Sequence, residues 1–143
     1  MNTLWEEYIF RILQKHKTDE IEVSFQNSDK FWENKRIRPD IVLKIKDETF
    51  VIDTKWKIIE ANNPSDDDLK QMFVYNLHWK AEKTLLLYPK INQIDSNFGT
   101  FHFDNLGKKC KLGFVDITNE LTIKNSQIVA NEIFAKILNN NRY

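Results

Sequence analysis

One stretch, Arg36 to Lys57 (RIRPDIVLKIKDETFVIDTKWK), constrains the fold of this chain more than any other. Two runs in which apolar and polar residues alternate flank a short polar segment, Lys46 to Thr49. Such alternation is typical of half-buried strands, and two runs around a tight turn predict a β-hairpin with one buried face. The hairpin carries Asp40, Asp53 and Lys55, three charged residues that need an explanation.

The turn decides which residues of this hairpin face one another. Residues directly opposite in an antiparallel pair share a face, and so do residues two apart on one strand. Asp40, Asp53 and Lys55 are therefore expected on one face. With Asp47 and Glu48 as the two turn residues, the facing pairs are Lys46 with Thr49, Val42 with Asp53, and Asp40 with Lys55.

A three-residue loop would shift the register by one and move Asp40 to the other face. Its carboxylate would then lie beside Ile52 and Trp56, among apolar side chains, so we reject that alternative. Pro39 cannot donate a hydrogen bond to a ladder and predicts a sheet edge or a bulge. A bulge beside Asp40 would also change the direction of its carboxylate.

Two interpretations of the three charges remain open at this point. Alternating charge on the solvated face of a hairpin commonly forms an ion-paired surface. The other interpretation is a divalent-cation site, because hard ions such as Mg2+ take oxygen ligands, typically one or two carboxylates with water and substrate phosphate. The rest of the chain has to decide between them.

Length and composition indicate a single domain over residues 1–143, with a core of its own. Hydrophobic residues make up 41% and aromatic residues 13%, which is a globular composition. The single cysteine, Cys110, excludes an internal disulfide, and no Cys/His cluster has zinc spacing. We therefore expect a reducing, cytoplasmic setting. The N-terminus does not read as a signal peptide, and the apolar run at Leu85 to Tyr88 is too short to span a membrane.

The charges balance, with 21 basic and 21 acidic residues, which argues against a protein that coats nucleic acid nonspecifically. Their distribution is uneven. From Lys30 to Lys57 there are eight basic and five acidic residues, a local excess of three. A basic surface around the hairpin and an ordinary solvated face explain this excess equally well.

The pattern around the hairpin predicts an α/β domain in which helices flank a mixed central sheet. A continuous apolar run after a helix predicts a central strand in parallel pairing. The expected helices are Thr3–His16, Asp66–Ala81 and Ser126–Leu138, and the further strands are Ile21–Phe25, Lys83–Lys90, Phe101–Phe103 and Lys111–Ile117.

Two helices carry polar residues near their buried faces. Glu6 lies at the edge of the apolar stripe of the first helix, either reaching out to water or directed into a polar cavity. Gln71, Tyr75 and His78 share a face of the second helix, which is either a buried helix edge or a surface turned toward a ligand.

The second helix also has a recognisable start. Ser65 with Asp68 three residues later resembles a capping box. Asp66 to Asp68 place negative charge at the positive end of the helix dipole. We interpret these aspartates as helix initiation rather than as metal ligands.

Four elements in this order resemble the PD-(D/E)xK nuclease superfamily. Asp40, preceded by Pro39, and the run Asp53-Thr54-Lys55 match the motif in the superfamily name. Gln71 to Tyr75 (QMFVY) matches the Q-x-x-x-Y element of a subset of these nucleases. Leu4 to Tyr8 (LWEEY) is similar to the N-terminal helix motif of the McrC-like branch, the nuclease subunit of modification-dependent restriction systems. The resemblance covers roughly residues 4 to 88 and implies a restriction-endonuclease-like fold.

The resemblance implies metal-dependent hydrolysis of DNA phosphodiester bonds, with Mg2+, or Mn2+ in its place, as cofactor. Asp40, Asp53 and the backbone carbonyl of Thr54 would hold the ion, and Lys55 would stabilise the anionic transition state. The other implied roles are an extended metal shell for Glu6, orientation of Lys55 or the phosphate for Gln71, and DNA-backbone contacts for Arg38, Lys57 and Tyr75.

The resemblance also implies partners: double-stranded DNA, a McrB-like AAA+ GTPase and a second copy of the chain. Proteins of the McrC type usually carry an additional N-terminal region that engages the GTPase, whereas this sequence begins at the nuclease helix. It is thus either a C-terminal domain or a protein that acts without that partner. The rival functions are a stand-alone repair or junction-resolving nuclease and a noncatalytic DNA-binding module.

Overall fold

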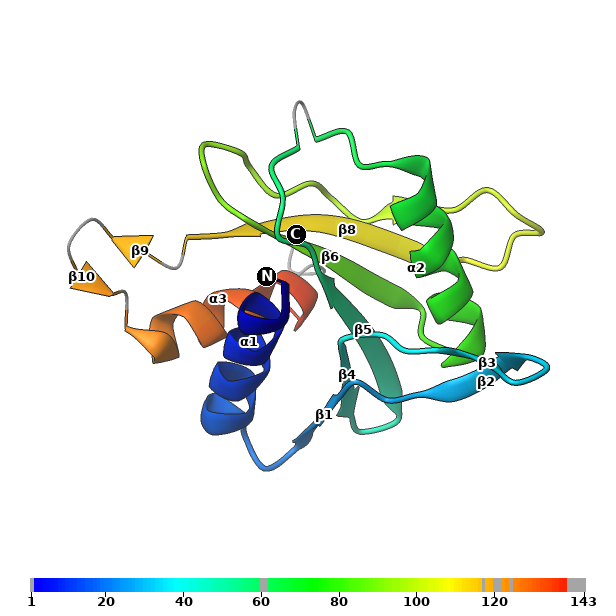
Figure 1. The fold of residues 1–143 in the computed structure, drawn as a ribbon, viewed down its shortest axis with the longest axis horizontal. Coiled ribbons are helices and arrows are strands. Elements are labelled where there is room, and N and C mark those ends of the chain that lie inside the picture. Colours follow the sequence, from blue (N-terminus) through cyan, green and yellow to red (C-terminus); the bar gives the residue numbers. More distant parts are fainter. Residues whose placement is uncertain (1, 60–61, 117, 120–121, 124, 139–143) are drawn as a thin grey trace.

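A six-stranded mixed sheet lies at the centre of the structure, a computed structural model that describes residues 2–59, 62–116, 118–119, 122–123 and 125–138 (Figure 1). Its strand order is β1-β4-β5-β6-β8-β7. The strands of this sheet are β1 (Ile21–Phe25), β4 (Ile41–Ile45), β5 (Glu48–Thr54), β6 (Lys83–Pro89), β7 (Gly99–Thr100) and β8 (Lys109–Val115). Two separate pairs are β2 (Asp29–Trp32) with β3 (Lys35–Ile37), and β9 (Thr118–Asn119) with β10 (Thr122–Ile123).

The sheet changes character at β5. This strand pairs antiparallel with β4 and parallel with β6, and β6 pairs parallel with β8. The crossover from β5 to β6 runs through the helix α2 (Asp66–His78), because parallel neighbours need a long connection. The expected parallel pairing of the apolar run after this helix is confirmed.

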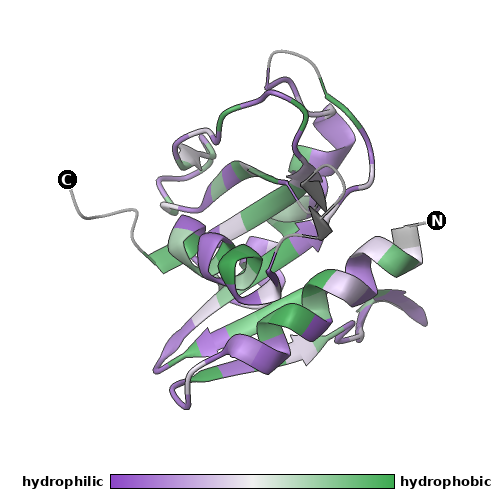
Figure 2. Cartoon of the chain, turned by 90° about the vertical axis from the view of Figure 1, so that its left-hand side faces the viewer, coloured by the Kyte–Doolittle hydropathy of each residue, from purple (hydrophilic) through white to green (hydrophobic). Residues whose placement is uncertain are grey.

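Helices cover both faces of the sheet, as expected. The helices α1 (Asn2–His16) and α3 (Ser126–Leu138) pack on one face, where Ile9, Leu13 and Ile133 are fully buried with alternate residues of β4 and β5. On the other face, α2 buries Met72 and Tyr75 against the remaining residues of these strands. Figure 2 shows hydrophobic residues running along the strands that the helices cover. Because both faces are buried, polar residues within these strands are exceptions that need a cause.

The second helix begins where the sequence predicts and ends earlier. Ser65 is the N-cap, and its hydroxyl accepts a hydrogen bond from the Asp68 amide at 3.0 Å. The helix stops at His78 rather than at Ala81. Lys80 adopts a positive φ of 56°, and the Asn76 side chain donates to the Ala81 carbonyl at 2.9 Å, which ends the helical ladder.

The predicted register of the β4–β5 hairpin is wrong by two residues. Lys44 faces Thr49 and Ile45 faces Glu48, so the turn consists of Lys46 and Asp47. Lys46 takes the left-handed conformation that this turn needs, with φ of 56°. A shift by two keeps every side chain on its predicted face. The predicted facing pairs are therefore corrected, while the grouping of Asp40, Asp53 and Lys55 survives.

The hairpin is also shorter than expected, because β4 begins at Ile41 rather than near Arg36. Arg36 belongs to β3, which pairs with β2 in a hairpin that the alternation pattern did not predict. Pro39 lies in the break between β3 and β4, in keeping with its missing donor.

Two expected elements near the other edge of the sheet differ. The strand expected at 101–103 is instead β7, two residues long, and Phe101 and Phe103 follow it and pack against Phe73. The strand expected at 111–117 starts earlier, at Lys109, and ends at Val115, while residue 117 lies outside the described residues. No helix in the described ranges is both long and apolar enough to cross a membrane.

Candidate active site

Two buried carboxylates lie side by side at one end of the β4–β5 pair. Asp53 is near the end of β5, and Asp40 directly precedes β4, at the position opposite Asp53 in the ladder. The Asp40 amide donates to Oδ1 of Asp53 at 3.4 Å. The two residues are only 9% and 4% exposed. Two such charges in a protein interior demand compensation.

Thr54 compensates Asp40 from the neighbouring strand. Its backbone amide and its hydroxyl both donate to Oδ2 of Asp40, at 2.8 and 2.7 Å. Both bonds go to the same oxygen, so the other oxygen of the carboxylate lies outside them. Thr54 is itself buried, and its side chain therefore serves the site rather than the solvated surface.

The pair holds its protons more tightly than ordinary aspartates. Burial, followed by repulsion from Asp40, raises the pKa of Asp53 from 3.8 to about 6. Burial also raises the pKa of Asp40; the two bonds from Thr54 oppose this rise, and the nearby charge of Glu6 adds to it. The two sites are electrostatically coupled, because like charges this close disfavour joint ionisation. A positive group at the pair would relieve that repulsion.

Lys55 supplies one such positive group. Its backbone amide donates to the Leu87 carbonyl at 2.8 Å, which extends the β5–β6 pairing by one residue. Its Nζ lies 2.9 Å from Oδ2 of Asp53. Burial alone would lower the pKa of Lys55, but the attraction of Asp53 and of other carboxylates outweighs it and raises the pKa. Lys55 is thus held as a cation beside the pair.

Gln71 and Tyr75 of α2 support this lysine in a chain of hydrogen bonds. Lys55 Nζ donates to Oε1 of Gln71 at 3.1 Å, and Gln71 Nε2 donates to the Tyr75 hydroxyl at 3.1 Å. That hydroxyl donates in turn to the Arg38 carbonyl at 3.2 Å. Burial raises the pKa of Tyr75 well above its ordinary value, so the hydroxyl stays protonated. The expected contact of Tyr75 with DNA stays a prediction. The Tyr75 side chain is only 3% exposed, which does not favour such a contact.

Asp68 belongs to the same cluster, although the sequence indicated only helix initiation. Its Oδ2 lies 2.8 Å from Lys57 Nζ and its Oδ1 lies 3.5 Å from Lys55 Nζ. The helix dipole already explains a carboxylate in the first turn of a helix. The contact of Asp68 with the two lysines was therefore not predicted. The position of Asp68 one turn before Gln71 was the available signal, because residues three apart share a helix face.

The remaining predicted site residues lie around the carboxylate pair. Glu6 is half-buried, and its Oε1 accepts a hydrogen bond from Gln26 at 3.2 Å, a partner that sequence reasoning missed. Arg38 is exposed, two residues before Asp40. Lys57 is also exposed but is already paired with Asp68. The DNA contacts expected of Arg38 and Lys57 stay predictions.

The donor set of the pair fits a hard divalent cation. Within the described ranges, no three His, Cys, Asp or Glu residues are grouped so as to hold a metal. Mg2+ nevertheless needs only one or two carboxylates, because it keeps several waters and takes substrate oxygens. The two carboxylates have raised pKa values and one positive neighbour, so their negative charge is not fully balanced. A divalent cation would balance it. Asp40 and Asp53 therefore fit such an ion.

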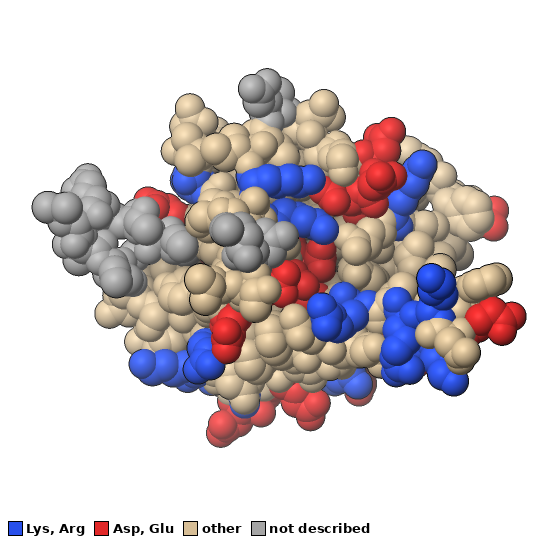
Figure 3. All heavy atoms as spheres, in the orientation of Figure 1, with Lys and Arg blue, Asp and Glu red and all other residues tan. Residues whose placement is uncertain are grey.

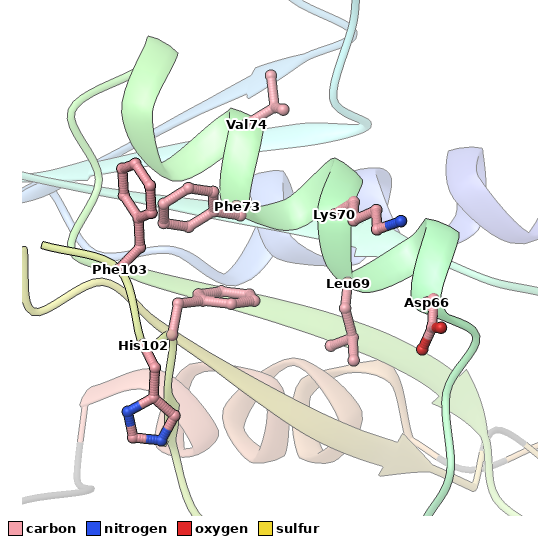
Figure 4. A pocket seen from close by; sticks show the side chains of 8 residues that line it. Asp66, Leu69, Lys70, Phe73, Val74, His102 and Phe103 are labelled. Carbon is pink, nitrogen blue, oxygen red and sulfur yellow. The ribbon is translucent and has the colours of Figure 1, made fainter.

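A hollow of about 680 Å³ lies on the opposite side of α2, and Asp40 and Asp53 do not line it. Leu69 and Phe73 of α2 line it together with Phe103, which lies beside Phe73 (Figure 4). These helix positions point away from Asp68 and Gln71, since a helix turns by 3.6 residues. The polar cluster and this apolar hollow are thus separate features.

The sheet topology, the helices on both faces and the buried carboxylate pair beside a lysine define a restriction-endonuclease-like α/β domain. The family model described as "McrBC 5-methylcytosine restriction system component" matches residues 1–89. The chain belongs to this family.

A solved structure shares the fold of this chain. The chain is similar to McrC in the tetradecameric assembly of Thermococcus gammatolerans McrB AAA+ hexamers with bound McrC, with a TM-score of 0.76 and 20% sequence identity. The match covers 96% of this chain but 33% of that one, so the chain spans about a third of the length of this relative. No curated protein matches the sequence.

Proposed function

We propose that the chain is a Mg2+-dependent DNA endonuclease of the PD-(D/E)xK type and the nuclease component of a McrBC-like restriction system. The observation that carries the proposal is the 2.9 Å contact of Lys55 Nζ with Asp53 Oδ2, beside the buried Asp40. A noncatalytic module that kept the fold would be expected to lose one of these three groups. All three are present and together.

Asp40, Asp53 and the backbone carbonyl of Thr54 are the groups that would hold the ion. When bound, Mg2+ supplies a Lewis acid that polarises the scissile phosphate and lowers the pKa of water. The chain's contribution is to fix the ligands before DNA arrives. Thr54 does this for Asp40 through two hydrogen bonds, which leave one carboxylate oxygen for the cation.

Lys55 presents a fixed positive charge where negative charge grows on the phosphoryl oxygens. A preorganised charge in a site that is largely shielded from water stabilises the transition state more than it would in water. Gln71 orients the ammonium, and the buried Tyr75 hydroxyl orients Gln71. Glu6 adds negative potential near Asp40 and could hold an outer water of the metal shell. Arg38 and Lys57 would contact phosphates of the bound duplex.

The partner follows from the relative rather than from this chain. McrC in the Thermococcus gammatolerans assembly is bound to McrB AAA+ hexamers. We extend this to a McrB-like AAA+ partner for the present protein. Pairing of two copies of the chain stays a prediction.

Cleavage of supercoiled plasmid in Mg2+, with EDTA as the blank, tests the function. Asp53→Asn and Lys55→Ala are expected to slow cleavage by about 100- to 1000-fold, the usual loss for one preorganised contact. Asp47→Asn, an exposed aspartate in the hairpin turn, is the matched control and should cut like the parent. Circular dichroism checks the fold of each variant. If purified Asp53→Asn cuts as fast as the parent, the assignment is wrong.

A further inference from the structure

The β2–β3 hairpin, Asp29–Ile37, stands apart from the central sheet and is not used by the proposed chemistry. We call it the arm. Among the described residues its two strands pair only with each other, and their register slips between Lys30 and Trp32, which marks a bulge. Figure 1 shows it extending beyond the edge of the sheet, beneath the end of α2. A two-stranded ribbon gains little stability from its own contacts.

Two adjacent aromatic residues on the arm are exposed. Phe31 is 54% exposed and Trp32 65%. Single exposed apolar residues are ordinary. Two consecutive exposed aromatic residues on a projecting ribbon offer more apolar surface than one, and large exposed apolar surface marks binding sites. The bulge falls at this dipeptide, and bulges re-aim side chains.

Basic side chains surround the aromatic pair. Lys30, Lys35 and Arg36 are all exposed, and Figure 3 shows basic side chains gathered over the arm at the right of that view. Residues 29–38 contain four basic and two acidic residues. One of the two acidic residues, Asp29, contacts His78 at 2.8 Å and so lies at the base of the arm, against α2. The arm therefore presents positive charge.

The base of the arm is fixed relative to the carboxylate pair. His78 of α2 holds Asp29, and Arg36 donates to the Ser28 hydroxyl at 2.7 Å. After β3 only Arg38 and Pro39 separate the arm from Asp40, and the Arg38 carbonyl accepts a hydrogen bond from the Tyr75 hydroxyl. Whatever the arm binds is consequently held at a set distance from the site.

We propose that the arm binds duplex DNA next to the site of cleavage. A two-stranded ribbon fits the major groove of B-DNA. Lysine and arginine side chains neutralise phosphates on both sides of a groove, and apolar side chains such as phenylalanine contact the thymine methyl group at the base edges. The inference rests on the proposed function for the choice of DNA as the ligand. Protein interfaces are enriched in aromatic residues and arginine but depleted in lysine, so Lys30 and Lys35 favour DNA over a protein partner.

Fluorescence anisotropy of a fluorescein-labelled DNA duplex, titrated in EDTA so that no cleavage occurs, tests the charge contribution. Lys30→Gln with Lys35→Gln is compared with Lys44→Gln with Lys46→Gln, an equally exposed pair at the far end of β4. Each lost phosphate contact should reduce the slope of log affinity against log salt by about 0.9. We expect a reduction of about 1.8 for the arm pair and a smaller change for the control.

The aromatic contribution has its own matched pair. Phe31 and Phe103 are 54% and 55% exposed, but only Phe31 is on the arm. Phe31→Ala and Trp32→Ala should each weaken duplex binding by about 10- to 150-fold, the range for the lost burial of one large apolar side chain. Phe103→Ala should bind like the parent.

The outcomes separate the arm from the nuclease. If the arm variants bind the duplex as the parent does, or if the controls lose as much, the arm inference is overturned while Mg2+-dependent cleavage by the parent still supports the nuclease. A protein-docking role for the arm would give this result. Conversely, if the arm variants lose binding but the parent never cleaves DNA, DNA binding by the arm is supported and the nuclease function is contradicted. A parent that binds no duplex overturns both.

Discussion

Thr54 places both its amide and its hydroxyl on one carboxylate oxygen of Asp40, at 2.8 and 2.7 Å. The residue between Asp53 and Lys55 is therefore a structural member of the candidate site and not a spacer. Hydrogen bonds from neutral donors to a buried carboxylate favour its charged form, which is the form that binds a cation.

Thr54→Val should weaken the use of Mg2+ while preserving shape. Valine keeps the volume but removes the hydroxyl donor, so the Asp40 carboxylate is less well oriented and binds its proton more tightly. Losses of this kind lower metal affinity by about 10- to 100-fold. The Mg2+ concentration for half-maximal cleavage measures the effect. Thr54→Ser retains the donor and is the control; equal Mg2+ dependence of the valine and serine variants would contradict the role.

The stability of the metal-free protein should fall as pH rises through the titration of Asp53. Its pKa is raised from 3.8 to about 6, chiefly by burial. Between these values the folded state binds more protons than the unfolded state, so the free energy of unfolding decreases with pH. At about 1.4 kcal/mol per pKa unit, the loss is on the order of 3 kcal/mol.

Urea denaturation in EDTA measures this loss against Asp53→Asn, which carries no such charge. The variant should be more stable than the parent at about pH 7, and the difference should shrink toward about pH 4. Adding Mg2+ should stabilise the parent and have little effect on the variant. If the parent is more stable than the variant at neutral pH in EDTA, the destabilising effect of the Asp53 charge is contradicted.

Asp68→Asn should slow cleavage through Lys55 and Lys57, both of which it contacts. Without this carboxylate the two ammonium groups repel each other and Lys55 loses part of its orientation. We expect a rate reduction of about 10- to 100-fold, the usual range for an outer partner of a metal site. Asp67→Asn removes the same charge from the same helix turn but is exposed, so it controls for the helix dipole. If the two variants cut at equal rates, Asp68 initiates the helix and has no role in the site.

Tyr75→Phe should destabilise the fold and slow cleavage, because the Gln71 amide loses its acceptor and the Arg38 carbonyl loses a donor. The expected change in the free energy of unfolding is about 1 kcal/mol. Tyr88→Phe is the matched control: Tyr88 is equally buried, but its hydroxyl has no hydrogen-bond partner in the described part of the chain. Thermal unfolding and plasmid cleavage check both variants. A variant at position 75 that unfolds and cuts like the parent would remove Tyr75 from the site.

Periodicity predicted the faces of the hairpin but not its register. Asp40, Asp53 and Lys55 share a face in any register of the same parity, so alternation alone was sufficient to group them. The turn itself depends on Lys46 adopting a positive φ, which lysine rarely does. Asp47 and Glu48 were the more conventional choice, and the tertiary structure overrode it.

The parts of the site contributed by α2 were harder to foresee. The burial of Tyr75 depends on how the helix rotates against the sheet, and helical spacing allowed either a buried or a ligand-facing edge. The arm escaped prediction because its strands (DKFW and KRI) are short and show no clear alternation. Short ribbons are specified by their turn and anchors, such as Asp29 with His78, which lie far apart in sequence.

The change from antiparallel to parallel pairing at β5 has a consequence for the order of assembly on the ribosome. Synthesis delivers the N-terminal part of a chain first. Asp40 and Asp53, thirteen residues apart, can meet in a local hairpin while water still reaches both. In the folded chain α2 brings Gln71 and Asp68 to Lys55, so these two contacts form only when the helix docks. We therefore expect the burial of the pair and this support of Lys55 to arise in the same folding step.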